Sequence, residues 1–153
     1  MTLARDRAGR TDPASSSGVR SFPFTPRSAT QLQVGDFWTV DLPSGGLGVL
    51  QVRDLVETGP GARSAFVVGV VEWRGEEPPL ATDLRGCRVL AQGLTRVEVF
   101  TEGQAAVLGN APDTVPVAGL TSPFRDFGVG TVTHVWGWKA LPRRVERELQ
   151  RDG

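Results

Sequence analysis

The chain of 153 residues has the length of one ordinary domain, and its 39% hydrophobic residues are enough to form a core. Seventeen basic residues balance seventeen acidic ones, so the net charge points neither to nucleic acid nor to an anionic membrane. One cysteine and one histidine leave almost no material for disulfides, a zinc site or an iron–sulfur cluster, and we expect no cofactor.

The charge is distributed unevenly along the chain. Residues 1–30 carry five arginines against two aspartates, whereas residues 31–142 carry eight basic residues against twelve acidic ones. The part of the chain expected to fold is therefore acidic. A nucleic-acid-binding domain normally concentrates positive charge on its folded surface, so this distribution counts against nucleic acid as the partner.

No targeting or membrane segment is visible in the sequence. The longest apolar run, residues 65–71, is far too short to span a bilayer. Charged residues occupy positions 5–10, where a secretory signal would need an apolar stretch. The single cysteine also suits a reducing compartment. We therefore expect a cytoplasmic protein that makes no use of a membrane.

The first half of the chain gives the clearest structural patterns. Residues 1–30 are expected to form a disordered extension, because they are rich in Ser, Pro and Arg and show no apolar period. A single β-rich domain is expected over residues 31–151. It opens with a hairpin at 36–56, in which two strand patterns flank the turn residues Pro43-Ser44-Gly45-Gly46. At 65–73 both alternating positions are apolar, as in a central strand buried on both faces.

The second half predicts shorter strands and one helix. Strands are expected at 87–90, 95–100, 104–108 and 131–138, with a turn at 92–93 and at most short extended pieces, such as 115–117, within 109–130. A helix is expected from Leu141, because Leu141, Val145 and Leu149 recur every four residues. The predicted fold is mainly β: a small, strongly twisted β-barrel or curled antiparallel sheet, similar to SH3-like barrels, with a C-terminal helix.

Few residues offer catalytic chemistry. His134 is the only histidine, and in the strand expected at 131–138 it shares an apolar face with Trp136 and Trp138, which favours a structural role. No G-x-S-x-G sequence is present to form a serine-based triad with it. A structural role is also favoured for Cys87, since an isolated cysteine at a strand start is more often a small buried residue than a nucleophile. We expect no enzymatic activity.

The hairpin segment 34–52 resembles the opening of the immunity protein 26 family of bacterial polymorphic toxin systems. That opening looks like a Gly-Asp pair, a strand, a Gly-containing turn, another Gly and a second strand ending in Val, which is matched here by Gly35, Asp36, Gly46, Gly48 and Val52. Leu47 and Asp41 depart from the pattern. The match extends loosely to residue 142, where the ending Trp138-Lys139-Ala140-Leu141-Pro142 is compatible with the family.

The resemblance implies a cytoplasmic immunity protein that binds and neutralises a cognate bacterial toxin without catalysis. An acidic domain agrees with a cationic partner such as a nuclease toxin, because charge complementarity raises the association rate. Toxin contact is expected around the loop after the central strand, with Trp73 as a possible anchor, at Glu72, Trp73, Glu76, Glu77 and Asp83.

Two alternative functions stay open. The first is a small nucleic-acid-binding β-barrel, in which Trp38, Trp136 and Trp138 stack bases and the N-terminal arginines provide an electrostatic arm. The second is a hydrolase with a carboxylate or His134 centre, because a catalytic carboxylate pair forms in space and leaves no mark on the sequence. The sequence does not distinguish an oligomeric state.

Overall fold

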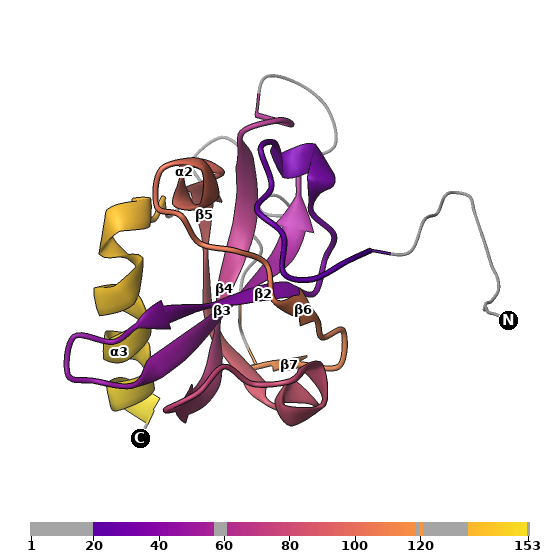
Figure 1. Cartoon of the computed structure of the whole chain (residues 1–153). Helices are drawn as coiled ribbons and strands as arrows, with labels where there is room; N and C mark the ends of the chain where they lie inside the picture. Colours follow the sequence, from indigo (N-terminus) through magenta and orange to yellow (C-terminus); the bar gives the residue numbers. More distant parts are fainter. Residues whose placement is uncertain (1–19, 57–60, 119, 121–134, 153) are drawn as a thin grey trace, which may run out of the picture.

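The computed structural model describes residues 20–56, 61–118, 120 and 135–152 (Figure 1). Within these residues, six strands form one curled sheet, in the order β6 (Gly109–Asn110), β2 (Asp36–Asp41), β3 (Leu47–Leu55), β4 (Ala65–Gly75), β5 (Arg88–Arg96) and β7 (Val115–Pro116). Neighbouring strands are antiparallel except for the β5–β7 pair. The predicted mainly β fold with a curled sheet and a C-terminal helix is confirmed.

The hairpin expected at 36–56 is formed by β2 and β3. Phe37 lies opposite Gln51 and Asp41 lies opposite Leu47, so the two strands pair along almost the whole length of β2. The turn between them passes through Gly45 and Gly46, whose φ angles of +107° and +81° suit residues without a Cβ. The turn chemistry visible in the sequence therefore fixes the register of this pair.

Strand β4 lies in the middle of the sheet and is buried on both faces, as its apolar sequence predicts. Phe66, Val68 and Val70 belong to the larger hydrophobic cluster, whereas Val71 belongs to a second cluster on the other face. The two clusters therefore lie on opposite faces of the sheet. The smaller one consists of Phe37, Val49, Val71, Leu84 and Ala111.

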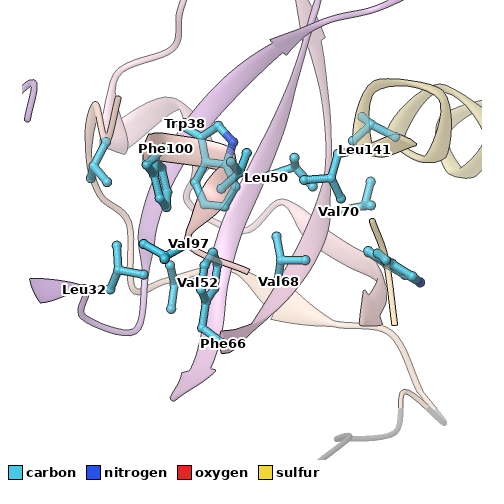
Figure 2. Close-up of a cluster of buried hydrophobic side chains, with 14 of the residues drawn as sticks. Leu32, Trp38, Leu50, Val52, Phe66, Val68, Val70, Val97, Phe100 and Leu141 are labelled. Carbon is cyan, nitrogen blue, oxygen red and sulfur yellow. The ribbon is translucent and has the colours of Figure 1, made fainter. Parts of the chain in front are cut away.

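The larger cluster fills the space between the sheet and the C-terminal helix (Figure 2). Trp38 and Phe100 meet edge to face with ring centroids 4.8 Å apart, and Phe66 lies 6.0 Å from both rings. Helix α3 (Leu141–Asp152) closes this side by burying Leu141 and Val145 completely. The helix predicted from Leu141 is thus confirmed.

Helix α3 packs closely on β3 at Gly48, one of the residues that match the immunity protein 26 pattern. A Cβ placed on Gly48 would lie 2.6 Å from Cγ1 of Val145, so only a glycine lets the helix approach β3 this closely. Arg144 and Glu148 of the helix form an ion pair with a 3.6 Å N–O distance, in which Glu148 is buried. No helix in the described ranges combines the length and the hydropathy needed to cross a bilayer.

The expected pair of strands at 87–90 and 95–100 is wrong. Residues 88–96 form the single strand β5, and the expected turn at 92–93 lies within it. The chain then enters the one-turn helix α2 (Glu98–Thr101), which buries both Val99 and Phe100. Consecutive residues of a strand point to opposite faces, whereas one helical turn lets both side chains enter the same cluster.

Two further strand predictions require correction. Residues 104–108 form no strand: Val107 makes an isolated bridge to Phe24, Leu108 N–H donates to the Phe37 carbonyl, and the strand β6 begins at residue 109. Of the strand expected at 131–138, residues 131–134 lie outside the described residues. Val135 makes an isolated bridge to Leu94, and the chain then turns into a 3₁₀ helix, η3 (Trp138–Ala140).

Residues 20–30, expected to belong to the extension, are part of the folded domain. Phe24 exchanges two backbone hydrogen bonds with Val107, and a short 3₁₀ helix, η1 (Ala29–Gln31), buries Ala29. Within the described part the domain therefore begins at Arg20, not at residue 31. Residues 1–19 lie outside the described residues.

Arg20 joins this segment to a completely buried carboxylate. Its two terminal nitrogens donate to the two oxygens of Asp36 at 2.7 and 2.6 Å. Asp36 also accepts hydrogen bonds from the backbone N–H of Gln33 at 2.9 Å and from Nδ2 of Asn110 at 3.0 Å. The side chain of Asp36 is 0% exposed, so its charge depends on these partners in place of water.

We expect Arg20→Ala to destabilise the domain by about 3–5 kcal/mol, because it leaves the Asp36 carboxylate buried and without a cation. Denaturant unfolding followed by circular dichroism measures this loss. Combining Arg20→Ala with Asp36→Asn should recover part of it, since the amide carries no charge. Arg85→Ala serves as the control, because the Arg85–Asp113 pair is exposed and 3.8 Å long. Equal unfolding midpoints for Arg20→Ala and Arg85→Ala would contradict the prediction.

Candidate functional site

The five residues proposed for partner contact lie at the end of β4 and in the segment that follows it. Glu72 and Trp73 belong to β4, and Glu76 and Glu77 follow its last residue. Asp83 belongs to a 3₁₀ helix, η2 (Ala81–Leu84). We call residues 76–83 the acidic loop. In Figure 1 it lies at the lower end of the sheet beside β7. Just after η2, the N–H of Gly86 donates to the carbonyl of Asp113, which precedes β7.

Two of the five residues line a common hollow. Glu72 and Trp73 contribute to an open hollow of about 400 Å³, together with Arg74 of β4 and Leu149 and Gln150 of α3. The Trp73 ring is half-buried and packs against the smaller hydrophobic cluster. The hollow is therefore lined by the aromatic ring of Trp73 on the sheet and by the aliphatic side chain of Leu149 on the helix.

Two of the predicted carboxylates have structural roles. Glu72 accepts two hydrogen bonds of 2.7 Å from Arg88 of the neighbouring strand, in a bidentate arrangement. Asp83 accepts the backbone N–H of Leu80 at 2.8 Å and so caps the start of η2. Glu76 and Glu77 are exposed and make no hydrogen bond or ion pair with the described residues. The charge available to a partner is thus concentrated at this pair.

Sequence reasoning did not identify the most exposed apolar side chain of this region. Leu80 is 70% exposed, although Pro79 before it is buried and Leu84 after it is completely buried. The signal in the sequence is a leucine that follows the Glu-Glu-Pro-Pro run. Its exposure could not be inferred, because it depends on how Pro79 and Leu84 anchor the segment on either side.

The tryptophans proposed as stacking platforms for bases are mostly inaccessible. Trp38 is 0% exposed and Trp136 only 7%, because both belong to the larger hydrophobic cluster. Trp138 is half-buried, with the Lys139 ammonium 5.5 Å from its ring centroid. One partly accessible ring remains of the three, so the nucleic-acid alternative loses Trp38 and Trp136 as stacking residues.

The described residues provide little catalytic machinery. No group of three His, Cys, Asp or Glu side chains among them could hold a metal ion. His134, the residue named for a hydrolase centre, lies outside the described residues. Cys87 is half-buried and its Sγ contacts the Asp83 carbonyl oxygen at 3.6 Å. Burial, followed by the charges of Glu72 and Asp83, raises the pKa of Cys87, which opposes a nucleophilic role.

Comparisons with protein-family models, curated proteins and solved structures find no match for this chain. The resemblance to immunity protein 26 therefore stays a prediction. The residues that carry it have structural roles here: Gly35 and Gly46 have positive φ, Gly48 contacts α3, and Asp36 forms the buried ion pair. The residues of the matching motif therefore have structural roles in the sheet, and the candidate binding residues lie elsewhere.

The raised pKa of Cys87 has a measurable consequence, because less thiolate is present at any given pH. We expect alkylation of Cys87 by iodoacetamide to have its pH midpoint above that of a cysteine in an unstructured peptide. Intact mass spectrometry measures the rate, and Cys87 is the only cysteine of the chain. Asp83→Asn should lower the midpoint, whereas Glu102→Gln in the turn after α2 should leave it unchanged. A midpoint at or below that of the peptide would contradict the expected direction of the shift.

Proposed function

We propose that this chain is a cytoplasmic, non-catalytic binding protein that neutralises a cognate bacterial toxin by direct contact, and that the acidic loop is its recognition element. The observation that carries the proposal is Leu80, an apolar side chain 70% exposed on a firmly anchored loop that also presents Glu76 and Glu77. An apolar anchor beside carboxylates that have no partner among the described residues matches a basic protein surface.

The anchoring of the acidic loop supports a role in binding. Pro79 is buried, the cap from Asp83 fixes the start of η2, and Leu84 belongs to the smaller hydrophobic cluster. A loop held in one conformation loses little entropy when a partner binds, so more of the contact energy is available for affinity. The same contacts keep Leu80 from folding back onto the sheet.

The charges around the loop support a basic partner. Glu72 is paired with Arg88, and Arg74 is held by hydrogen bonds to Ser44 Oγ and the Gly45 carbonyl, both at 2.8 Å. The acceptors of Arg74 are neutral, so it keeps its positive charge, and Glu76 and Glu77 are the exposed carboxylates of the acidic loop that have no cation among the described residues. Exposed carboxylates of this kind act mainly on association rate and partner choice.

We expect Leu80→Ser to weaken binding to the toxin by about tenfold or more, since a central apolar anchor contributes over ~1 kcal/mol. The candidate toxin is the protein encoded next to this chain, and biolayer interferometry with the purified pair gives the affinity. Val34→Ser is the matched control, because Val34 is 50% exposed in a different loop. Absence of any complex, together with no protection of growth on co-expression, would overturn the proposed function.

Charge reversal tests the electrostatic part of the proposal separately. We expect Glu76→Lys combined with Glu77→Lys to reduce the association rate about tenfold at low salt, and less at high salt, because exposed charges steer encounter. The double variant Asp41→Lys with Glu102→Lys changes the net charge equally at two other exposed positions. Equal rate losses in the two double variants would show that only net charge matters, and would contradict a role for the acidic loop.

A further inference from the structure

Arg53 is a half-buried cation in the sheet, and it crosses three strands. It belongs to β3, between Val52 and Asp54, where the pairing with β4 shifts register. Its side chain runs over Gly69 of β4, since a Cβ on that glycine would lie 2.7 Å from the Arg53 Cγ. Its Nε then donates to Oε1 of Gln92 on β5 at 3.1 Å. The guanidinium is therefore fixed over the middle of the sheet, on the face opposite α3.

Neutral groups hold the guanidinium in place. Nη1 donates to Oε1 of Gln51 and to Oγ1 of Thr114, both at 3.0 Å. Gln51 is completely buried and fixed in turn by its Nε2, which donates to the carbonyls of Ala111 and Gly35. Thr114 Oγ1 also donates to Gln51 Oε1 at 2.8 Å. The acceptors around Arg53 are rigid and carry no charge.

Two donors of Arg53 remain without an acceptor. A guanidinium has five N–H groups, of which Nε uses one and Nη1 uses two in these contacts. The two N–H groups of Nη2 bond to no acceptor in the described part of the chain. The contacts that fix the guanidinium therefore involve Nε and Nη1 and leave the Nη2 N–H groups without an acceptor among the described residues.

The described part of the chain also supplies no counter-ion for Arg53. Arg20, Arg88 and Arg144 each contact a carboxylate, whereas no carboxylate of the described residues lies within ion-pair distance of Arg53. Burial lowers the pKa of Arg53, which reflects the cost of keeping this cation away from water. An arginine nevertheless stays protonated in a protein, so the positive charge persists.

We infer that Arg53 is a binding site for a carboxylate, which the Nη2 edge receives. A single carboxylate neutralises the charge one for one and accepts one of the two Nη2 N–H groups, which diverge from the same nitrogen, whereas a purely structural role between neutral acceptors needs no cation at all. The rigid frame of Gln51, Gln92 and Thr114 means that no side chain must be reordered when the anion binds. The carboxylate can come from a small free anion or from an acidic side chain of another protein.

Acetate tests the site directly in the full-length protein. The Nε–H resonance of Arg53 is followed by ¹⁵N-correlated NMR while sodium acetate replaces sodium chloride at constant ionic strength. We expect a saturable shift of this resonance, and no saturable shift at Arg20, which already holds Asp36. A linear drift at Arg53, or the same response at both arginines, would overturn the inference.

Variants of Arg53 provide a second test of the carboxylate site. Arg53→Gln should lose the saturable acetate response at the backbone amides of Gly69 and Thr114, and Arg53→Lys should retain a weaker one, because it keeps the charge without the planar fork. If Arg53→Gln does not fold, the comparison of Arg53 with Arg20 in the wild-type protein still decides the question. Retention of the full response in a folded Arg53→Gln protein would overturn the inference.

A blocked glutamate, N-acetylglutamate amide, distinguishes the two sources of the carboxylate. Tighter binding than acetate supports a protein side chain, and equal or weaker binding supports a small free anion. The site does not depend on the proposed function: these experiments contain no toxin, and the variants that test the acidic loop leave Arg53 intact. A failure of either proposal can therefore be told from a failure of the other.

Discussion

The buried carboxylate of Asp36 is the interaction on which one side of the sheet depends. Its four hydrogen bonds reach the N-terminal segment through Arg20, the approach to β2 through Gln33, and the edge strand β6 through Asn110. A charge removed from water in this way tolerates only a geometry in which all partners are present together. It therefore specifies where three separate parts of the chain must meet, even though the net stability gained from such a pair is modest.

The hydrogen bonds that begin beside Asp36 continue to Gln51 and Arg53 of β3. The carbonyl of Gly35, the residue before Asp36, accepts a hydrogen bond from Gln51, and Gln51 in turn accepts one from Arg53. The motif glycine has a φ of +100°, a conformation in which a residue with a Cβ would be strained. The position of the Arg53 guanidinium thus follows from the same turn that places the Asp36 carboxylate in the core. The buried Asp36 carboxylate has its counter-ion within the fold, whereas the half-buried Arg53 guanidinium has none among the described residues.

The fold was predictable wherever the signal lies within a few neighbouring residues. The alternation and turn glycines of 36–56, the apolar run of β4 and the four-residue spacing of α3 each identify an element without reference to the rest. The segment 95–100 misleads because Val97, Val99 and Phe100 have strand propensity, and only their shared burial in the larger cluster selects a helical turn. The folded position of Arg20 was equally hidden, since its partner Asp36 lies sixteen residues away.

The candidate sites show the same limit more sharply. Sequence patterns pointed to the acidic loop, but they could not separate the exposed carboxylates of Glu76 and Glu77 from those of Glu72 and Asp83, which complete contacts within the chain. Neither the exposure of Leu80 nor the surroundings of Arg53 follow from the neighbouring sequence. Leu80 is exposed because its neighbours are anchored, and Arg53 lacks a carboxylate among the described residues because of which side chains the neighbouring strands place beside it.

The motif and the proposed sites therefore follow different constraints. Gly35, Asp36 and Gly48 make contacts within the sheet and with α3, so their roles in this chain do not involve a binding partner. Glu76, Glu77 and Leu80 make no comparable contribution to the core, and a change at these positions costs the fold little. In a scaffold built in this way, the acidic loop can change its sequence while the buried carboxylate of Asp36 keeps its partners and α3 keeps its packing on β3.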